Sequence, residues 1–490
     1  MKMRLSTFVT LTTILATCKT ASAAATTTYD ALIIGGGFSG LNAAKTLAAA
    51  GKSFLVLEAR NRTGGRVHNE QLPGGGYTEV GGQYFGPTQD YSLALANELG
   101  VALYETYNTG KNVYYNKGYR ALASSDSFIG QAIPAVDAVS LIQLLAAETD
   151  LNNMAKKINV QRPWNTSKTT NAWDNQSFGS WLDGRLLTPI ARAILDTATT
   201  AIFSAEADEL SLLYTVAYIA AGGNSTTPGT FDRLTSTANG SQMYRVVGGT
   251  EILASKLASK LGSGKVALNS PVQSVTKKSD GTYSVKTRGG KAYSAKHVIV
   301  AMSPPVAAKI NYSPALTPLR TQLGQRTAMG SIGKAIATYD SPFWRTAGLT
   351  GQAISGTGTT RTTFDQSLSD NSTYALMGFI EANEMQNLDG ASVDEITSLV
   401  EQDFVNYFGP GARNVTSWTV QRWDLEEFSL GGPVANFVTL GSYTRFGPAL
   451  RAPIGNLHFA GTESADYWVG YIDGALRAGE RAAKEVIAAL

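Results

Sequence analysis

A glycine cluster between an apolar run and a helical pattern constrains the fold of this chain most strongly. Gly35–Gly40 (GGGFSG) follows the apolar run Ala31–Ile34 and precedes apolar residues at helical spacing. Phe54–Leu57 then has the pattern of a second buried strand, which ends at Glu58. A strand, a G-x-G-x-x-G turn, a helix and an acidic residue about 20 positions on are typical of a dinucleotide-binding βαβ unit. The pattern predicts an α/β protein with a Rossmann-type domain.

Each glycine of the cluster has its own expected task. Gly35 allows the tight turn, Gly37 lets the backbone approach a pyrophosphate, and Gly40 lets helix and strand pack closely. The helix N-terminus then faces the phosphates, and Glu58 accepts hydrogen bonds from the ribose hydroxyls. A solvent turn without a ligand is the alternative, and the acidic strand end argues against it.

The residues after Glu58 distinguish the two common dinucleotides. The segment Glu58–Val67 (EARNRTGGRV) carries two arginines and a glycine pair, and a second pair, Gly81-Gly82, follows in YTEVGGQYFGPTQ. Further glycine pairs near the phosphate site suit an elongated ligand whose far end also needs close backbone approach. FAD fits this pattern better than a nicotinamide.

Composition excludes several classes of protein. With 490 residues, the chain is long enough for about two to four domains. Hydrophobic residues make up 43% and charged residues 16%, as in an ordinary globular protein with a large core. The net charge of +3 is small for this length, so we expect no nucleic-acid partner. Three scattered histidines argue against a metal site.

The first residues have the pattern of a secretory signal peptide. Lys2 and Arg4 precede a largely apolar stretch, and Ala21-Ser22-Ala23 forms a cleavage signal, so residues 1–23 are predicted to be removed. Cys18, the single cysteine, lies in this leader. We expect a secreted glycoprotein without a membrane anchor. The Asn-x-Ser/Thr acceptor sites are Asn165, Asn175, Asn224, Asn239, Asn311, Asn371 and Asn414.

The C-terminal region predicts a second helix aimed at the ligand. Leu457–Ala460 has the pattern of a short strand, and Tyr471–Leu490 that of an amphipathic helix. If the helix N-terminus faces the flavin pyrimidine edge, its dipole stabilises the negative charge of the reduced ring. A surface helix docked on the sheet is the alternative.

Several stretches together resemble the flavin-containing amine oxidases, the family of monoamine oxidase and polyamine oxidase. They are ALIIGGGFSGLNAAKTLAAAG, LEARNRTGGRV, EVGGQYFGPTQDYSLALANELGV, FSAEADELSLLYTVAYIAAGG, YRVVGGTEILASKLASKLG, GSIGKAIATYDSPFWR and FAGTESADYWVGYIDGALRAGERAAKEV, and they span nearly the whole chain. The pattern is closer to monoamine oxidase.

The resemblance implies a discontinuous FAD-binding domain and a substrate-binding domain of mixed sheet and helices. The expected FAD-binding ranges are 29–104, 238–310 and 428–490, and the substrate-binding ranges are 105–237 and 311–427. The implied reaction is hydride transfer from the amine α-carbon to flavin N5, hydrolysis of the imine to aldehyde and ammonia, and flavin reoxidation by O2 to give H2O2. An L-amino-acid or polyamine oxidase and a flavin dehydrogenase of secondary metabolism are the alternatives on this fold.

The resemblance also implies roles for particular residues. Lys334 (in GSIGKAIATY) matches the lysine that holds a water near flavin N5, and Tyr471 matches one of two aromatic walls that guide the amine. Pro433 and Val434 stand where monoamine oxidases carry a flavin-linked cysteine and the second tyrosine. Phe428 and Phe437 are candidates for the second wall.

Two sets of binding residues follow. The expected cofactor contacts are Gly35, Gly37, Phe38, Ser39, Gly40, Glu58, Ala59, Arg60, Gly65, Arg66, Gly81, Gly82, Gln83, Tyr84, Val272, Trp423, Gly461, Glu463, Tyr471 and Ile472. The expected substrate contacts are Phe203, Tyr218, Val434 and Tyr471.

Some alternatives stay open at this point. FAD is expected to be held without a cysteinyl bond, whereas His68 leaves a histidyl link open. The two other histidines, His297 and His458, are expected to be packed in apolar strands. Monomer and homo-oligomer are both open. Clamps for a carboxylate (Arg233, Arg245 or Arg361) and for polyamine ends (Glu206 or Glu209) are candidates without a distinguishing signal.

Overall fold

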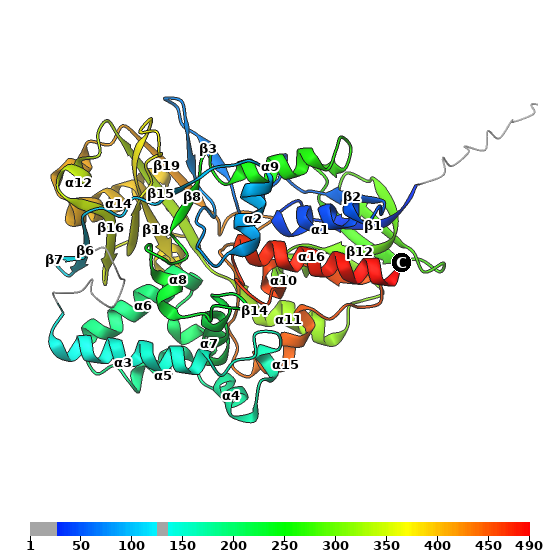
Figure 1. The fold of residues 1–490 in the computed structure, drawn as a ribbon, viewed down its shortest axis with the longest axis horizontal. Helices are drawn as coiled ribbons and strands as arrows, with labels where there is room; N and C mark the ends of the chain where they lie inside the picture. Colours follow the sequence, from blue (N-terminus) through cyan, green and yellow to red (C-terminus); the bar gives the residue numbers. More distant parts are fainter. Residues whose placement is uncertain (1–26, 125–135) are drawn as a thin grey trace, which may run out of the picture.

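The computed structural model describes residues 27–124 and 136–490. The predicted signal peptide and Cys18 lie outside these residues. Two large sheets form the two ends of an elongated molecule, and helices connect them along one side (Figure 1). The α/β fold predicted from the sequence is confirmed.

The first sheet is built around β1 (Thr28–Ile34). It pairs in parallel with β2 (Phe54–Leu57) on one side and with β12 (Ala292–Val300) on the other. The predicted strands at Ala31–Ile34, Phe54–Leu57 and Leu457–Ala460 are confirmed. The sheet order is β13 (Asn311–Ser313), β10 (Val272–Lys277), β11 (Tyr283–Thr287), β12, β1, β2 and β9 (Val266–Ala267), with β21 (Leu457–Phe459) also paired to β12.

Two helices lie side by side on this sheet. α1 (Phe38–Ala49) and α16 (Ile472–Ala489) pack closely along their lengths, and Figure 1 shows them together near the centre of the molecule. Gly479 allows this approach, because a Cβ there would overlap the carbonyl of Ser39. Both helices were predicted from apolar spacing, and both are confirmed. Two further helices near this sheet are α2 (Asp90–Glu98) and α9 (Glu251–Lys260).

The second sheet is mostly antiparallel. Its strand β15 (Ile332–Tyr339), next to the edge of the sheet, is buried along its whole length and carries Lys334. Neighbours β18 (Tyr374–Glu381) and β19 (Ser417–Arg422) pair with β15 on its two sides. The order continues from β18 through β17 (Thr362–Asp365), β16 (Leu349–Ser355), β6 (Lys111–Asn116) and β7 (Tyr119–Ser124).

Helices cover this sheet and bridge it to the first. On the lower side of Figure 1 lies the helical layer, whose α7 (Leu212–Ala221) has every residue buried. The remaining α-helices of the described chain, in this layer and elsewhere, are α3 (Ala138–Ala155), α4 (Lys168–Ala172), α5 (Phe178–Asp183), α6 (Pro189–Phe203), α8 (Phe231–Thr235), α10 (Pro304–Ala307), α11 (Pro318–Arg326), α12 (Phe343–Thr346), α13 (Ala382–Asn387), α14 (Val393–Phe408) and α15 (Ser442–Phe446).

Three short strand pairs lie outside the two large sheets. They are β3 (Asn69–Gln71) with β4 (Tyr77–Glu79), β5 (Leu103–Glu105) with β8 (Tyr244–Val246), and β14 (Thr327–Met329) with β20 (Ala435–Phe437). The first sheet takes in β13, which lies just beyond position 310, so it reaches into the range predicted for the substrate-binding domain. The domain boundaries themselves stay predictions.

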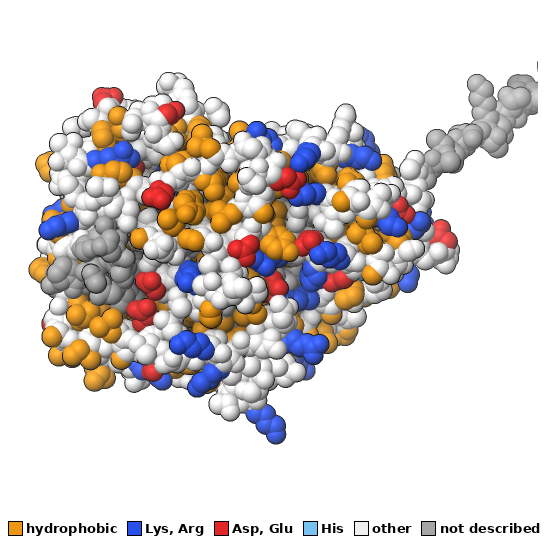
Figure 2. Space-filling model, viewed as in Figure 1, with side chains coloured by type: hydrophobic (Ala, Val, Ile, Leu, Met, Phe, Trp, Pro, Cys, Tyr) orange, Lys and Arg blue, Asp and Glu red, His pale blue; other side chains and the backbone are white. Residues whose placement is uncertain are grey.

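The surface agrees with the small net charge. On the face seen in Figure 2, Lys and Arg side chains are interspersed with Asp and Glu, and apolar side chains lie between them. Within residues 27–124 and 136–490, no helix has the length and apolar character needed to cross a bilayer.

Candidate active site

A long pocket runs between the two sheets and collects most of the predicted residues. Glu58 and Arg60 line it on the side of the first sheet, and Lys334, Phe364 and Phe379 line it on the side of the second. Predicted residues in its lining are Gly35, Gly37, Phe38, Ser39, Glu58, Ala59, Arg60, Gly65, Arg66, Gly81, Gly82, Gln83, Tyr84, Tyr218, Val272, Lys334, Trp423, Gly461, Tyr471 and Ile472.

The glycine cluster forms one end of the pocket. The carboxylate of Glu58 accepts hydrogen bonds from the backbone N–H of Gly36 (2.5 Å) and of Arg60 (2.8 Å), so it ties the glycine turn to the end of β2. α1 begins after Gly37 without a side-chain cap, and the buried hydroxyl of Ser39 has no partner among the described residues. Uncapped helix N–H groups and a free hydroxyl are donors that a pyrophosphate would accept from.

Tight packing explains why the first turn needs glycine. Gly35 has a φ of +108°, and a Cβ there would lie 2.7 Å from the carbonyl oxygen of Ala301. A Cβ at Gly40 would overlap the carbonyl oxygen of Gly35. Gly40 therefore lies behind the pocket lining and permits the close packing of α1 on β1.

The second uncapped helix start lies at the same pocket. α16 begins after Tyr471 with no side-chain cap, and Ile472 and Ala475 of its first turn line the pocket. The hydroxyl of Thr462 donates to the carbonyl of Tyr471 (2.9 Å) and fixes the entry of the helix. The positive end of the helix dipole therefore faces the pocket, as the sequence predicts.

Two arginines of the pocket lining, Arg60 and Arg66, form ion pairs with glutamates from the C-terminal part of the chain. Arg66 donates to Glu463 (2.9 Å) and to the carbonyl of Pro433 (2.6 Å). Glu463 itself lies behind the lining, so it acts on the pocket through Arg66. Arg60 is held by Glu426 (2.9 Å).

Lys334 reaches across from the second sheet to the segment Glu79–Gln83. Its Nζ donates to the carbonyls of Glu79 (3.2 Å) and Gly81 (2.6 Å) and to Oε1 of Gln83 (2.6 Å). The side chain is only 3% exposed, and this burial lowers its pKa to about 7. The lysine is therefore not a solvated strand-edge residue.

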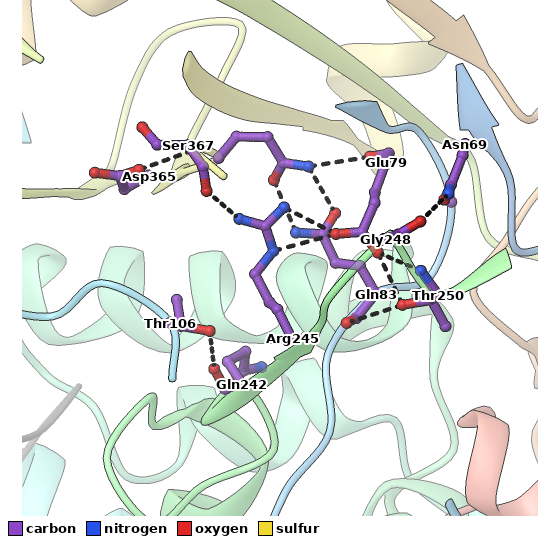
Figure 3. A network of polar contacts seen from close by, with 12 residues as sticks. Asn69, Glu79, Gln83, Thr106, Gln242, Arg245, Gly248, Thr250, Asp365 and Ser367 are labelled. Carbon is purple, nitrogen blue, oxygen red and sulfur yellow. Dashed lines mark hydrogen bonds and ion pairs between the residues drawn. The ribbon is translucent and has the colours of Figure 1, made fainter. Parts of the chain in front are cut away.

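The buried ion pair of Glu79 and Arg245 lies beside this lysine. Both side chains are 1% exposed, and Arg245 Nη2 lies 2.8 Å from Glu79 Oε2 (Figure 3). The other Glu79 oxygen accepts from the hydroxyl of Thr250 (2.8 Å), and Arg245 donates to the carbonyl of Ser367 (2.8 Å). Because the two opposite charges are in contact, the pair adds little net charge near Lys334.

Trp423 also lines the pocket. Its indole N–H donates to the carbonyl of Val80 (2.7 Å). The tryptophan therefore holds the same backbone segment as Lys334 does.

Two groups of aromatic rings lie at the pocket. Tyr471 packs against Trp468 (ring centroids 4.8 Å apart) and near Tyr218 (6.3 Å), and burial raises the pKa of Tyr471 to about 12. On the second sheet, Phe364 lies 5.5 Å from Tyr84 and 6.1 Å from Phe379.

Two predicted substrate contacts lie behind the wall. Phe203 is buried and packs on Tyr218 (4.7 Å), and Val434 is buried beside Gly470. Neither is in the pocket lining, because Tyr218 and Gly470 stand in front of them.

The two candidates for the second aromatic wall lie in different places, and only Phe428 is in the pocket lining. Phe437 packs in the core against Tyr443 (4.7 Å). Phe428 lines the pocket between the guanidinium groups of Arg60 and Arg288, at the Glu58 end. Phe364 and Phe379 add aromatic rings to the lining from the second sheet.

The three histidines contact residues outside the pocket lining. His68 Nδ1 lies 2.8 Å from Glu251, and the residue is absent from the pocket lining. His297 and His458 are buried and face each other at 3.2 Å, as packed histidines would.

Pocket residues that the sequence did not single out include members of β17, β18 and the segment after β12. They lacked a motif, and strand pairing was needed to place Phe379 directly opposite Lys334. No alternation of apolar and polar residues in β15 or β18 indicates which face meets the pocket, because both strands are buried on both faces. The additional lining residues include Ile202, Ser270, Pro271, Arg288, Ala301, Met302, Ser303, Ile332, Thr362, Phe364, Phe379 and Thr462.

Comparison with known proteins gives one consistent result. The family model described as flavin containing amine oxidoreductase matches residues 38–487. AofH of Mycobacterium tuberculosis is 36% identical over 463 residues, covering 94% of this chain and 97% of its own. The flavin-containing amine oxidase of Oncorhynchus mykiss is 34% identical, covering 94% and 86%.

Solved structures show the same fold. Cyclohexylamine oxidase from Brevibacterium oxydans superposes with a TM-score of 0.87 at 29% identity, covering 94% of this chain and 99% of that one. Putrescine oxidase bound to putrescine gives the same TM-score, identity and coverage.

Proposed function

The chain belongs to the flavin containing amine oxidoreductases and is a flavin-dependent amine oxidase, and from this premise we propose that it oxidises a small monoamine to an aldehyde and ammonia with O2 as acceptor. One observation supports this most. A single pocket joins two uncapped helix N-termini at a glycine cradle to a buried lysine among aromatic rings.

The residues present fit FAD. Ser39 and the start of α1 would hold the pyrophosphate, Glu58 the ribose, and the start of α16 the ring's pyrimidine edge. When bound, FAD accepts the hydride of the amine α-carbon at N5 and passes the electrons to O2, which leaves as H2O2. The attachment is proposed to be non-covalent, since Pro433 stands in the lining at the cysteine position of monoamine oxidases and His68 lies outside it.

The chain's own residues orient the amine. Tyr471 and Tyr218 on one side and Phe379 on the other offer aromatic faces that attract an ammonium and then pack against the free base. An amine must lose its proton before it gives up hydride, and a dry aromatic wall favours the neutral form. Lys334 stands in the same pocket as the titratable donor proposed to assist reaction with O2.

Contacts elsewhere favour a monoamine over the alternative substrates. The arginines considered as carboxylate clamps have other partners: Arg245 binds Glu79, Arg233 the carbonyl of Pro228, and Arg361 binds Glu384. None of these arginines lines the pocket. Glu206 and Glu209, the candidates for polyamine ends, are also absent from the lining.

A panel of amines under nitrogen tests the proposal. Monoamines, diamines, polyamines and L-amino acids are added to the purified yellow protein, and loss of the flavin absorbance is recorded. We expect bleaching by monoamines and, on admission of air, return of colour with one H2O2 per amine. Bleaching without peroxide on aeration would support a dehydrogenase instead. A flavin that no amine reduces would contradict the proposal.

We also propose that the enzyme is secreted. The basic start, apolar stretch and small-residue cleavage signal of residues 1–23, together with the Asn-x-Ser/Thr sites, support this. Mass spectrometry of the N-terminus and glycans of the protein from culture medium tests it. An intact Met1 on a cell-retained protein would contradict it.

A further inference from the structure

The backbone between β4 and the aromatic pocket wall is held by side chains of the second sheet. Carbonyl oxygens of Glu79, Val80 and Gly81 accept hydrogen bonds from Lys334 and Trp423, and Gln366 adds a further bond to Glu79 (3.3 Å). Gly81, Gly82 and Gln83 of this segment line the pocket. The groups that hold Lys334 therefore also shape the cofactor site.

Every partner of Lys334 is a hydrogen-bond acceptor. Two are backbone carbonyls and the third is the amide oxygen of Gln83. A neutral amine has two N–H groups and a lone pair, whereas an ammonium has three N–H groups and no lone pair. The three acceptors therefore match the ammonium form, although burial favours loss of the proton.

The orientation of the Gln83 amide depends on Gln366. Gln83 Nε2 donates to Gln366 Oε1 (2.7 Å), and Gln366 Nε2 donates back to Gln83 Oε1 (3.2 Å). The carbonyl of Glu79 accepts from the same Gln366 Nε2, so rotating both amides would place two acceptor oxygens together. Glu79 thus fixes Gln366, and Gln366 fixes Gln83.

We propose that Gln366 is a positioning residue that, through its reciprocal amide pair with Gln83, keeps an oxygen directed at Lys334 and so holds the lysine in its ammonium form. Gln366 is not in the pocket lining. It is linked to Lys334 through Gln83 and through the Glu79 carbonyl, which accepts from both side chains. The charged groups near Lys334 are Glu79 on β4 and Arg245 on β8, and they neutralise each other. The proposal concerns the state of the lysine, and only its effect on reoxidation rests on the proposed function.

Replacing Gln366 frees the amide of Gln83. In Gln366→Leu, Gln83 can rotate and donate an N–H to the lone pair of a neutral Lys334, which stabilises the neutral form. Loss of one hydrogen bond to a charged group lowers the titration midpoint of Lys334 by about one pH unit.

Competitive labelling with acetic anhydride measures this midpoint directly. The protein with FAD bound is labelled at a series of pH values, and mass spectrometry of the peptide carrying Lys334 gives the fraction of reactive neutral amine. We expect a lower midpoint in Gln366→Leu and an unchanged midpoint in the control Gln402→Leu, whose side chain is exposed on α14.

A double-mutant cycle separates positioning from general structural damage. Gln83→Glu places oxygens on both positions of the side chain, so rotation no longer matters, and the added charge raises the midpoint. We therefore expect Gln366→Leu to lower the midpoint in the wild-type background and not in the Gln83→Glu background.

Two results would overturn the proposal: a wild-type midpoint in Gln366→Leu, or an equal lowering in both backgrounds. The pH profile of flavin reoxidation, measured after dithionite reduction, is the second readout. A shifted labelling midpoint with no shift in that profile would leave the positioning standing and refute the proposed role of Lys334 in reoxidation.

Discussion

Glu381→Gln is expected to make the protein more stable at neutral and alkaline pH. Glu381 ends β18, is 4% exposed and pairs in register with Ile332 of β15. Neither of its carboxylate oxygens has a hydrogen-bond partner among the described residues. Burial raises its pKa from 4.5 to about 8, Arg361 opposes the shift, and Glu206 adds to it.

The sign and size follow from proton linkage. Below pH 4.5 the carboxyl is neutral in the folded and unfolded chains and costs nothing through ionisation. As pH rises, the unfolded chain ionises first, so folding stability falls until the folded pKa of about 8 is passed. Between pH 5 and pH 7.5 the loss amounts to about 3 kcal/mol. Glutamine does not titrate, so the variant lacks this loss.

Thermal unfolding at a series of pH values provides the assay. A chain of 490 residues has an unfolding entropy of about 1 kcal/mol per degree, so the difference in midpoint between variant and wild type should grow by about 3 °C from pH 5 to pH 7.5. Glu105→Gln, at an exposed position on β5, is the matched control and should show a constant difference. A constant difference for Glu381→Gln as well would refute the reasoning.

Three further predictions concern the pocket. Lys334→Met should slow reoxidation of the flavin by O2 about 10²-fold in stopped-flow measurements and should slow flavin reduction far less. Lys256→Met, on the exposed face of α9, should change neither step. Equal slowing of both steps in Lys334→Met would contradict the role of Lys334. Gly40→Ala should lower the free energy of unfolding by about 2 kcal/mol or more and reduce FAD retention on gel filtration, because the new Cβ overlaps the carbonyl oxygen of Gly35. Gly74→Ala, where the new Cβ has open space around it, should do neither. Tyr471→Ala should lower kcat/KM about tenfold through loss of an aromatic face, and Tyr471→Phe should keep most of it; equal losses would place the function in the hydroxyl.

Local patterns predicted the glycine turn, Glu58 and the start of α16, which all lie at the pocket. The turn Gly35–Gly40 and Glu58 belong to one βαβ unit and lie about 20 positions apart. The start of α16 is far away in sequence and was recognised from the helix's own amphipathic pattern. Here helix and strand boundaries agree with expectation to within a few residues. Short-range chemistry, namely turn geometry and helix dipoles, decides this end of the pocket.

The other half of the pocket, where substrate contacts were predicted, depends on packing between distant segments. Val434 and Phe203 were expected to contact substrate, and the structure places them behind Gly470 and Tyr218. Phe379 carries no motif, yet register with β15 places it beside Lys334, whose Nζ lies 5.4 Å from the ring. Which face of a strand meets a cavity depends on its partners across the sheet.

The sequence by itself determined the class of fold, the dinucleotide site and the family, since each rests on residues close along the chain or on a match across nearly all of it. Only the tertiary structure decided how Lys334 is held and which aromatic rings of the second sheet line the pocket. Glu79, Gln83, Lys334 and Gln366 are separated by up to 287 positions and meet because two sheets pack over one pocket. Their hydrogen bonds and shared burial exist only in that packing, and no local pattern carries them.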